Sequence, residues 1–362
     1  MKILILYTYN QGLLSEFFQE LSERLCSDDF EVVNFYLKHK KDFFVQNKVR
    51  IYGEKRGHFT HNYKAIYQII KKTKPDVVIS NFSYINPAIL FGKLLGVRQN
   101  IAWFHTAYGH TKPSWLKVFN KSIYLNMADV VLTNSTSLQK EMHGVYKVAI
   151  PKTRCVPFWT NISRHRTDSD PLKMVKDTSI LNIGCPGRLV ADKNQALVLQ
   201  AIHKLKQTKG QTLRLYIAGS GPHQAPLEQL VEDLDLGQEV VFLGLLNVKE
   251  MTSFYEVMDV VVLPSFHEAF GLVFIEAIAM GTPVLVSNTF GALDFIDEKK
   301  FPLEDFSFDP HDIQELIDKL EPYLNYRGLS ADYFKRLHEA TFDKEVIYNQ
   351  VKSVILNQNI PS

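Results

Sequence analysis

Cysteine is scarce in this chain of 362 residues, which has only Cys26, Cys155 and Cys185. They are widely spaced and form no Cys-x-x-Cys pair, which argues against a disulfide framework or a zinc site and for a reducing compartment. A membrane-spanning helix needs about 20 apolar residues. The nearest candidate, 270–280, is shorter and carries Glu276 in its middle. The apolar run at 3–7 is too short for a secretory signal, so we expect a soluble, cytoplasmic protein.

Two further absences narrow the functional classes. No Gly-x-Gly-x-x-Gly follows the first apolar run, which argues against a dinucleotide-dependent dehydrogenase. No strand-like run precedes the Asp-x-Asp triplet Asp168-Ser-Asp170, so we do not expect this triplet to bind a metal ion. Hydrophobic residues make up 46% of the chain and charged residues 22%, values that exclude a disordered, collagenous or coiled-coil protein.

Charge is distributed unevenly along the chain. Residues 1–165 hold 23 Lys and Arg against 11 Asp and Glu, a net charge of +12, and residues 166–362 hold 18 against 28, a net charge of −10. The split indicates two domains with different partners. A solvated, lysine-rich surface on the first half would also explain it.

Apolar runs of strand length alternate with segments of helical periodicity, as in a doubly wound α/β fold. Strands are expected at 2–7, 31–36, 76–80, 99–104, 129–133, 179–185, 213–218, 239–242, 259–263 and 283–287. Helices are expected at 14–26, 63–72, 87–95, 115–127, 136–143, 194–207, 226–233, 249–257 and 272–280, with a mainly helical tail over 312–357. The polar stretch 158–170 indicates a linker. The pattern predicts two Rossmann-like domains that face each other across a cleft.

The segment from Gly187 to Asn194 follows a predicted strand and opens a predicted helix. Gly187 lets the backbone turn tightly, while Arg188 and Lys193 place two cations beside the N–H groups of the helix N-terminus. This combination predicts an anion site, most simply for a diphosphate. Alternatively, Arg188 and Lys193 are surface residues of an ordinary loop.

A second segment, 264–283, also lies at a strand-to-helix junction. Glu268 falls in the loop, Gly271 begins the helix, and Glu276 follows eight residues after Glu268 in an otherwise apolar run. Burying a carboxylate that has no partner destabilises the folded protein by several kcal/mol, on the order of the usual penalty for burying a charge. Glu276 is therefore expected to face a cleft or a partner, such as a ribose diol.

Together these motifs resemble the retaining GT-B glycosyltransferases of family 4. The resemblance rests on Gly-Arg-Leu-x-x-x-Lys-Asn at 187–194, Ala-Gly-Ser-Gly-Pro at 218–222, Phe-Leu-Gly at 242–244, Pro-Ser-x-x-Glu-x-Phe-Gly-x-x-x-x-Glu-Ala at 264–277 and Gly-Thr-Pro-Val at 281–284. It is dense over 178–300 and thinner over 1–177. It implies an acceptor-binding domain at 1–160, a nucleotide-sugar-binding domain at 171–340, and a C-terminal helix at 341–362 that packs on the first domain. The apolar residues of that helix are spaced for one buried face: Val346, Ile347, Val351, Val354 and Ile355.

The resemblance also implies roles for single residues. Arg188 and Lys193 match the pair that binds the donor diphosphate. Glu276 matches the residue that binds the ribose, and Glu268 matches the carboxylate that lies over the donor sugar. The loop around the nucleotide and sugar matches Gly187, Gly219, Gly221, Gly244, Leu245, Phe270, Gly271 and Leu272.

The first half matches the family more loosely. His105 stands after the strand predicted at 99–104, where relatives have a histidine that contacts the donor sugar, and His110 is a rival for that role. In the first strand-to-helix loop, where many relatives carry two adjacent glycines, only Gly12 is present. No cofactor and no metal are expected, because two cations and a helix terminus can neutralise the departing diphosphate.

The implied activity is transfer of a sugar from a nucleotide-sugar, most simply a UDP-sugar, to a glycan or lipid-linked acceptor in cell-surface polysaccharide or glycolipid synthesis. A nucleotide-sugar 2-epimerase of the same fold and a non-catalytic sugar-binding protein are the alternatives. No nucleic-acid partner is expected. The basic, aromatic segment 112–121 places Trp115, Leu116 and Phe119 on one helical face, which suits either an anionic membrane surface or packing against the first sheet.

Overall fold

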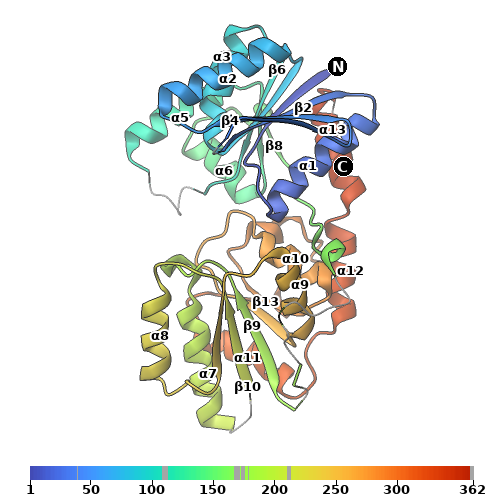
Figure 1. Ribbon diagram of the computed structural model, residues 1–362. Coiled ribbons are helices and arrows are strands. Elements are labelled where there is room, and N and C mark those ends of the chain that lie inside the picture. The colour runs from blue at the N-terminus through green and yellow to red at the C-terminus, as the bar shows by residue number, and fades with distance from the viewer. Residues whose placement is uncertain are drawn as a thin grey trace. The chain divides into compact units, whose positions relative to one another are not determined.

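The computed structural model describes residues 1–38, 40–107, 113–166, 172, 176–177, 179–209 and 213–358. It divides into two compact units. Unit 1 consists of Met1–Trp159 and Lys344–Ser362, and unit 2 of Thr160–Asp343. Each unit contains one extended sheet covered by helices (Figure 1), and both sheets are built mainly of parallel strands, which confirms the α/β fold class.

The sheet of unit 1 has eight strands in the order β3-β4-β2-β1-β5-β6-β7-β8. They are β1 Lys2–Leu6, β2 Glu31–Lys38, β3 Asp42–Gln46, β4 Val49–Lys55, β5 Val77–Asn81, β6 Gln99–Phe104, β7 Val130–Thr133 and β8 Thr153–Cys155. The helices are α1 Leu13–Ser27, α2 Phe59–Thr73, α3 Ile85–Leu94, α5 Trp115–Met127, α6 Thr136–Gly144 and α13 Lys344–Ile355. Chain order reverses between the adjacent strands β1 and β5.

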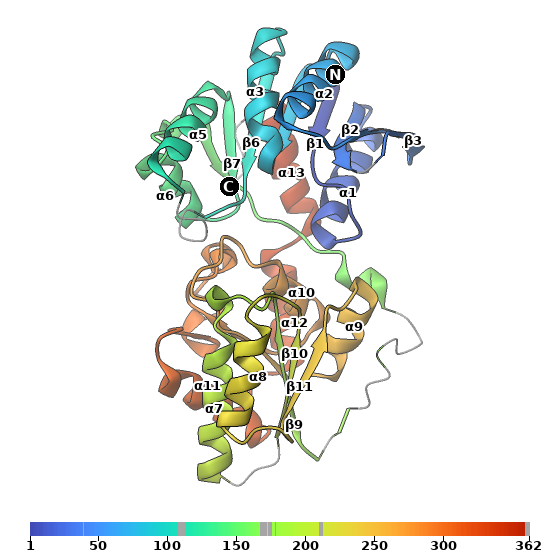
Figure 2. The ribbon, with the colours of Figure 1, turned by 60° about the vertical axis from the view of Figure 1, so that its left-hand side comes forward.

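The two faces of this sheet are covered by different helices (Figure 2). Alternate residues of a strand point to opposite faces, and on β6 Phe104 packs with α3, α5 and α6 while Trp103 contacts the rings of Phe17 and Phe18 from α1. Helix α13 lies on the same side as α1, where Gln99 Nε2 donates to the carbonyl of Val354 at 2.9 Å. Unit 1 is therefore a three-layer α/β domain.

The sequence did not predict the antiparallel hairpin of β3 and β4. Its two-residue turn is Asn47-Lys48, and both residues have positive φ, 47° and 69°. Such turns suit paired strands, but Gly is their usual second residue. Because lysine stands there instead, the turn gave no signal.

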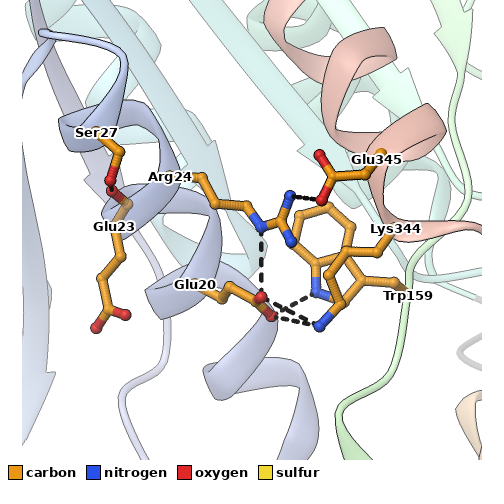
Figure 3. Close-up of polar contacts among 7 residues, drawn as sticks. All are labelled: Glu20, Glu23, Arg24, Ser27, Trp159, Lys344 and Glu345. Atoms are coloured by element: carbon orange, nitrogen blue, oxygen red, sulfur yellow. Dashed lines mark hydrogen bonds and ion pairs between the residues drawn. The ribbon is translucent and has the colours of Figure 1, made fainter.

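A carboxylate on α1 joins the two ends of unit 1 that border unit 2 in sequence (Figure 3). Glu20 accepts hydrogen bonds from Trp159 Nε1 at 3.0 Å and from Lys344 Nζ at 3.1 Å, and it pairs with Arg24 Nε at 3.3 Å. Arg24 in turn pairs with Glu345 at 2.7 Å. The last residue before unit 2 and the first residue after it are thus fixed to the same side chain.

Helix α13 adds apolar contacts and a second polar anchor to unit 1. Ile347, Val351, Val354 and Ile355 are buried, whereas Val346, expected on the same face, is 56% exposed. Asp28 accepts hydrogen bonds from Tyr348 Oη at 2.5 Å and Lys352 Nζ at 2.6 Å, and these two donors lower the pKa of Asp28.

The stretch expected to be a linker begins with buried residues. The ring of Phe158 meets that of Phe17 edge to face and the ring of Trp159 is tilted against it, with centroids 4.7 and 4.2 Å apart, and Ile162 is fully buried. The chain passes from unit 1 to unit 2 between Trp159 and Thr160, within the stretch expected to be a linker. The polar residues around Phe158 and Trp159 concealed that these two side chains anchor its start to unit 1. Residues 167–171 lie outside the described part of the chain.

The sheet of unit 2 is fully parallel, in the order β11-β10-β9-β12-β13-β14. Its strands are β9 Leu181–Pro186, β10 Leu213–Ala218, β11 Val240–Gly244, β12 Val260–Leu263, β13 Val284–Ser287 and β14 Ser307–Phe308. The helices are α7 Gln195–Lys209, α8 Gln224–Asp233, α9 Val248–Val257, α10 Leu272–Met280, α11 Ile313–Leu324 and α12 Ala331–Thr341. Helices α7, α8 and α11 form one outer layer, and α9, α10 and α12 form the other.

Across the described ranges, none of the helices combines the length and the apolar character that crossing a bilayer requires.

Candidate functional site

The two motif loops of unit 2 leave neighbouring strands at the point where chain order reverses. Strand β9 leads to Gly187 and β12 leads to Pro264, and the two strands pair directly through Ile183 and Val260. From this pair the chain order runs outward in both directions. Open α/β sheets bind ligands at the carboxyl ends of strands at such a reversal.

Three contacts join the two loops. Phe266 N donates to the carbonyl of Asp192 at 2.9 Å, and His267 Nδ1 lies 3.0 Å from Asp192 Oδ1. Lys193 forms an ion pair with Glu268, and the two side chains are only 15% and 17% exposed. The structure therefore brings the predicted Lys193 and Glu268 together, and it adds Asp192 and His267 as residues that hold the loops in place.

Asp192 and His267 were not predicted, although each adjoins a predicted residue. Asp192 precedes Lys193 in the first loop, and His267 precedes Glu268 in the second. Each loop therefore holds an acidic and a basic residue side by side, so each residue can pair with its counterpart in the other loop. This complementarity is the one signal in the sequence that could have revealed the joined loops.

Arg188 is exposed, and its guanidinium forms no ion pair with a carboxylate in the part of the chain that the structure describes. Its backbone is fixed by a hydrogen bond, in which Nε2 of the buried Gln195 side chain donates to the Arg188 carbonyl at 3.0 Å. The side chain thus extends from a fixed loop with its charge available to an anion.

The predicted glycines pack against the first loop. Gly187 N donates to the Ala218 carbonyl at 2.8 Å, and Gly219 N donates to the Gly244 carbonyl at 2.7 Å. A Cβ on Gly219 would collide with the carbonyl of Gly187, and one on Gly221 would collide with the carbonyl of Leu189. The turns after β9, β10 and β11 are therefore in direct backbone contact with one another. Leu245, which follows Gly244, is 79% exposed.

Gly271 begins α10 in a conformation that excludes other residues. Its φ is +95°, and a Cβ there would collide with the ring of Phe290. Phe270 is buried, and its carbonyl accepts from Ala292 N at 2.9 Å. Phe274 N donates to the carbonyl of Gly271 at 3.0 Å, and the two preceding N–H groups, those of Leu272 and Val273, lie at the positively polarised N-terminus of the helix.

Glu276 is half-buried on α10 and has a partner from another helix. It accepts a hydrogen bond from Tyr255 Oη of α9 at 3.0 Å. Burial raises the pKa of Glu276 to about 7, against the lowering effect of the Tyr255 hydrogen bond. Nothing in the local sequence indicates Tyr255 as a partner of Glu276, because the contact joins separate helices.

His105 lies in unit 1, fixed between two amides. Its Nδ1 is 2.6 Å from Asn134 Oδ1 and its Nε2 is 2.7 Å from Asn81 Oδ1. Both amide nitrogens donate to backbone carbonyls, those of Val156 and Leu6, which keeps both Oδ1 atoms against the ring. Burial lowers the pKa of His105 to about 4, although the hydrogen bond with Asn134 acts in the opposite sense.

Gly12 is also in unit 1. It precedes α1, and its N–H donates to Asn10 Oδ1 at 2.9 Å, so this N–H already has a partner. His110, the rival of His105, and the Asp168–Asp170 triplet lie outside the described residues. In the described ranges, no group of three or more His, Cys, Asp and Glu side chains is arranged to hold a metal ion.

Comparisons with known proteins cover both units. The family model described as Glycosyltransferase Family 4 matches residues 14–164, and the model described as Glycosyl transferases group 1 matches residues 173–339. An uncharacterized glycosyltransferase of Methanocaldococcus jannaschii is 35% identical over 37% of this chain. That match spans only 34% of the relative's length.

Two solved structures show the same fold over almost the whole chain. Sucrose-phosphate synthase from Thermosynechococcus elongatus has a TM-score of 0.78 and 20% identity, covering 99% of this chain and 98% of its own. The Anabaena protein HepE, solved in complex with UDP and glucose, has a TM-score of 0.78 and 17% identity, covering 99% and 100%. With both halves matched by family models, the chain belongs to the GT-B glycosyltransferases of family 4.

Proposed function

We propose that this chain is a retaining, metal-independent glycosyltransferase. It transfers a sugar from a nucleotide-sugar donor, a UDP-sugar, to a glycan or lipid-linked acceptor in polysaccharide or glycolipid synthesis. Unit 2 holds the donor and unit 1 the acceptor. The UDP assignment draws on the complex of HepE with UDP and glucose, a protein of the same fold.

The meeting of the loops after β9 and β12 carries this proposal. One loop offers Arg188 as a cation without an ion-pair partner among the described residues. The other loop ends at the N-terminus of α10, where the N–H groups of Leu272 and Val273 begin the helix. Between them Lys193 and Glu268 form a nearly enclosed ion pair. A diphosphate needs the cations and N–H groups, and a sugar needs the carboxylate.

The proposed chemistry separates charge along the donor. As the bond between the anomeric carbon and phosphate breaks, the sugar gains oxocarbenium character and the diphosphate gains negative charge. Arg188, Lys193 and the α10 N-terminus stabilise the diphosphate, and Glu268 lies over the sugar. Because Lys193 is already oriented by Glu268, little reorganisation is needed when the donor binds.

Other residues position the donor. Glu276 accepts from the ribose hydroxyls while Tyr255 holds its other side. The backbone around the nucleotide is formed by Gly187, Gly219, Gly221, Gly244, Leu245, Phe270, Gly271 and Leu272. On unit 1, His105 contributes a contact to the sugar. Gly12 contributes a contact to the phosphates, for which its N–H exchanges Asn10 Oδ1 for a phosphate oxygen. Since both His105 ring nitrogens contact amides, the sugar contact requires exchange of one of them.

One assay separates this function from the alternatives. The protein is incubated with UDP-sugars, and the products are resolved by chromatography. Release of UDP with transfer of the sugar supports the proposal. An epimerised nucleotide-sugar would identify a 2-epimerase, and an unchanged donor for every UDP-, GDP- and ADP-sugar would identify a binding protein.

We also propose that unit 1 associates peripherally with the inner, anionic face of the cytoplasmic membrane. On α5, Trp115, Leu116, Phe119 and Ile123 are 74%, 58%, 61% and 45% exposed, so this face does not pack against the sheet. The core contact is made by Leu125 on the opposite side of the helix. An exposed apolar face on a half with net charge +12 suits anionic lipid.

Liposome sedimentation tests the membrane proposal. Binding to anionic and not to neutral liposomes is expected at low salt, with release at higher ionic strength. Trp115→Ser with Phe119→Ser should abolish it, whereas Ile150→Ser, which removes an exposed apolar residue outside α5, should not. Equal binding to both liposome types, or to neither, contradicts the proposal.

A further inference from the structure

Two adjoining cavities of unit 1 form a groove at the carboxyl edge of its sheet. Their volumes are about 310 and 340 Å³, and Ser83 and Lys121 line both. The first cavity continues to His105 and Lys117, and the second continues to Arg56. Lys121 therefore lies where the two cavities of the groove adjoin.

The groove lies where chain order reverses in unit 1. Thr8 follows β1 and Ser83 follows β5, and these two neighbouring strands are the point of reversal. A ligand site is therefore expected at this edge of unit 1, as at the corresponding edge of unit 2.

The lining of the groove is cationic. Arg56, Lys117 and Lys121 line it, and no Asp or Glu is among the described residues of either cavity. Lys121 is half-buried, and the hydrogen-bond acceptor of its Nζ is a neutral one, Asn86 Oδ1 at 2.9 Å. Burial lowers the pKa of Lys121 to about 8. A partly desolvated ammonium without a carboxylate is unfavourable, and an anionic ligand would compensate it.

A strained residue stands at the same place. Phe82 has φ of +51°, in the left-handed region that a bulky side chain rarely adopts. Its ring lies 4.9 Å from that of His105, and both residues line the first cavity. Strain of this kind persists where the surroundings impose it, and it concentrates at ligand sites. Phe82 immediately precedes Ser83, which lines both cavities.

We propose that this groove binds a phosphate group of the acceptor, with Arg56, Lys117 and Lys121 as its cations and Ser83 as a hydroxyl donor. The acceptor is accordingly a phosphorylated molecule. That identification rests on the proposed function, whereas the anion site itself does not.

Equilibrium dialysis of the full chain against radiolabelled inorganic phosphate tests the site. Saturating UDP is present to occupy unit 2, and ionic strength is held constant with chloride. Arg56 and Lys117 are exposed, so Arg56→Gln and Lys117→Gln should keep the fold. Each should weaken phosphate binding about tenfold, as expected for loss of one charge-assisted hydrogen bond. Lys121→Gln, checked for an unchanged melting temperature, should weaken it at least as much.

The matched control is Lys140→Gln, which removes an exposed lysine of α6 that lines neither cavity. It should bind phosphate as the wild type does. The site is overturned if Arg56→Gln and Lys117→Gln bind phosphate like this control, or if the wild type binds none once UDP is present. A chain that fails to release UDP from any donor yet shows the groove pattern would overturn the glycosyltransferase proposal alone.

Discussion

The carboxyl edges of the two sheets differ in how their cations are balanced. In unit 2 Lys193 is paired with Glu268, and Glu276 stands nearby in sequence with Tyr255 as its donor. In unit 1 the described lining of the groove holds Arg56, Lys117 and Lys121 without a carboxylate. The same architecture thus carries a balanced site in one unit and an unbalanced cationic site in the other.

This difference accounts for part of the charge split along the sequence. A donor with a neutral sugar and a charged diphosphate needs both carboxylates and cations, whereas a phosphate alone needs cations. The net charges of −10 and +12 for the two halves follow the same direction. A substitution or truncation confined to one unit leaves the other unit as an internal reference.

The largest effect is expected from removal of α13. Deleting residues after Asp343 removes the buried side chains of Ile347, Val351 and Ile355, each worth about 1.5–3 kcal/mol, and uncovers the surface of unit 1 on which they pack. It also removes the Lys344 contact to Glu20. All three tryptophans lie in unit 1, so tryptophan fluorescence reports that unit alone. Its melting midpoint should fall sharply, while a chain ending at Gln358 should be unchanged. Equal midpoints for both truncations would disprove the role of α13.

Loss of a diphosphate cation should come next in size. Arg188→Ala and Lys193→Ala should each lower turnover by about 10²–10³, as removal of one electrostatic donor typically does. Lys249→Ala removes an exposed lysine of α9 and should retain wild-type turnover. Because Lys193→Ala leaves Glu268 unpaired, its melting temperature is measured alongside. Wild-type turnover in either site variant contradicts the assignment.

The raised pKa of Glu276 predicts that the stability of unit 2 depends on pH. This pKa is raised from 4.5 to about 7 in the folded protein. Between these values the folded state therefore binds more protons than the unfolded state, and stability falls as pH rises from about 4.5 through 7. The loss is up to about 3 kcal/mol, by the usual value per pKa unit. Calorimetry should show it in the wild type and not in Glu276→Gln; parallel curves would refute the raised pKa.

The smallest effect is expected from chelation. If Arg188, Lys193 and the α10 N-terminus neutralise the diphosphate, excess EDTA should leave the rate of UDP release unchanged. Loss of activity that Mg²⁺ or Mn²⁺ restores would show that a metal shares this task.

Much of the fold was predictable because its signals are local. Strand, glycine turn and helix follow one another within a few residues at Gly187 and again at Gly271, so both junctions were located from the sequence. The pairing of Lys193 with Glu268, 75 residues apart, was not deduced, because it depends on β9 and β12 being neighbours.

Whether an apolar or charged side chain faces solvent or packs inside the protein could not be predicted from its spacing along a helix. The spacing of Trp115, Leu116 and Phe119 predicted a shared helical face, but periodicity does not distinguish a face toward the sheet from one toward solvent. The structure exposes that face and buries Leu125 instead. In α13 the same ambiguity placed Val346 wrongly, and for Glu276 the distant Tyr255 supplied a partner that local sequence could not indicate.

Calorimetric titration of the full chain with UDP tests most directly that the joined loops of unit 2 form the donor site. One UDP should bind per chain, about tenfold or more weakly to Arg188→Ala and to Glu276→Gln, and with unchanged affinity to Lys249→Ala and to Arg56→Gln of unit 1. Unchanged UDP affinity in Arg188→Ala and Glu276→Gln, or weakening by Arg56→Gln alone, would contradict the assignment of the donor to unit 2.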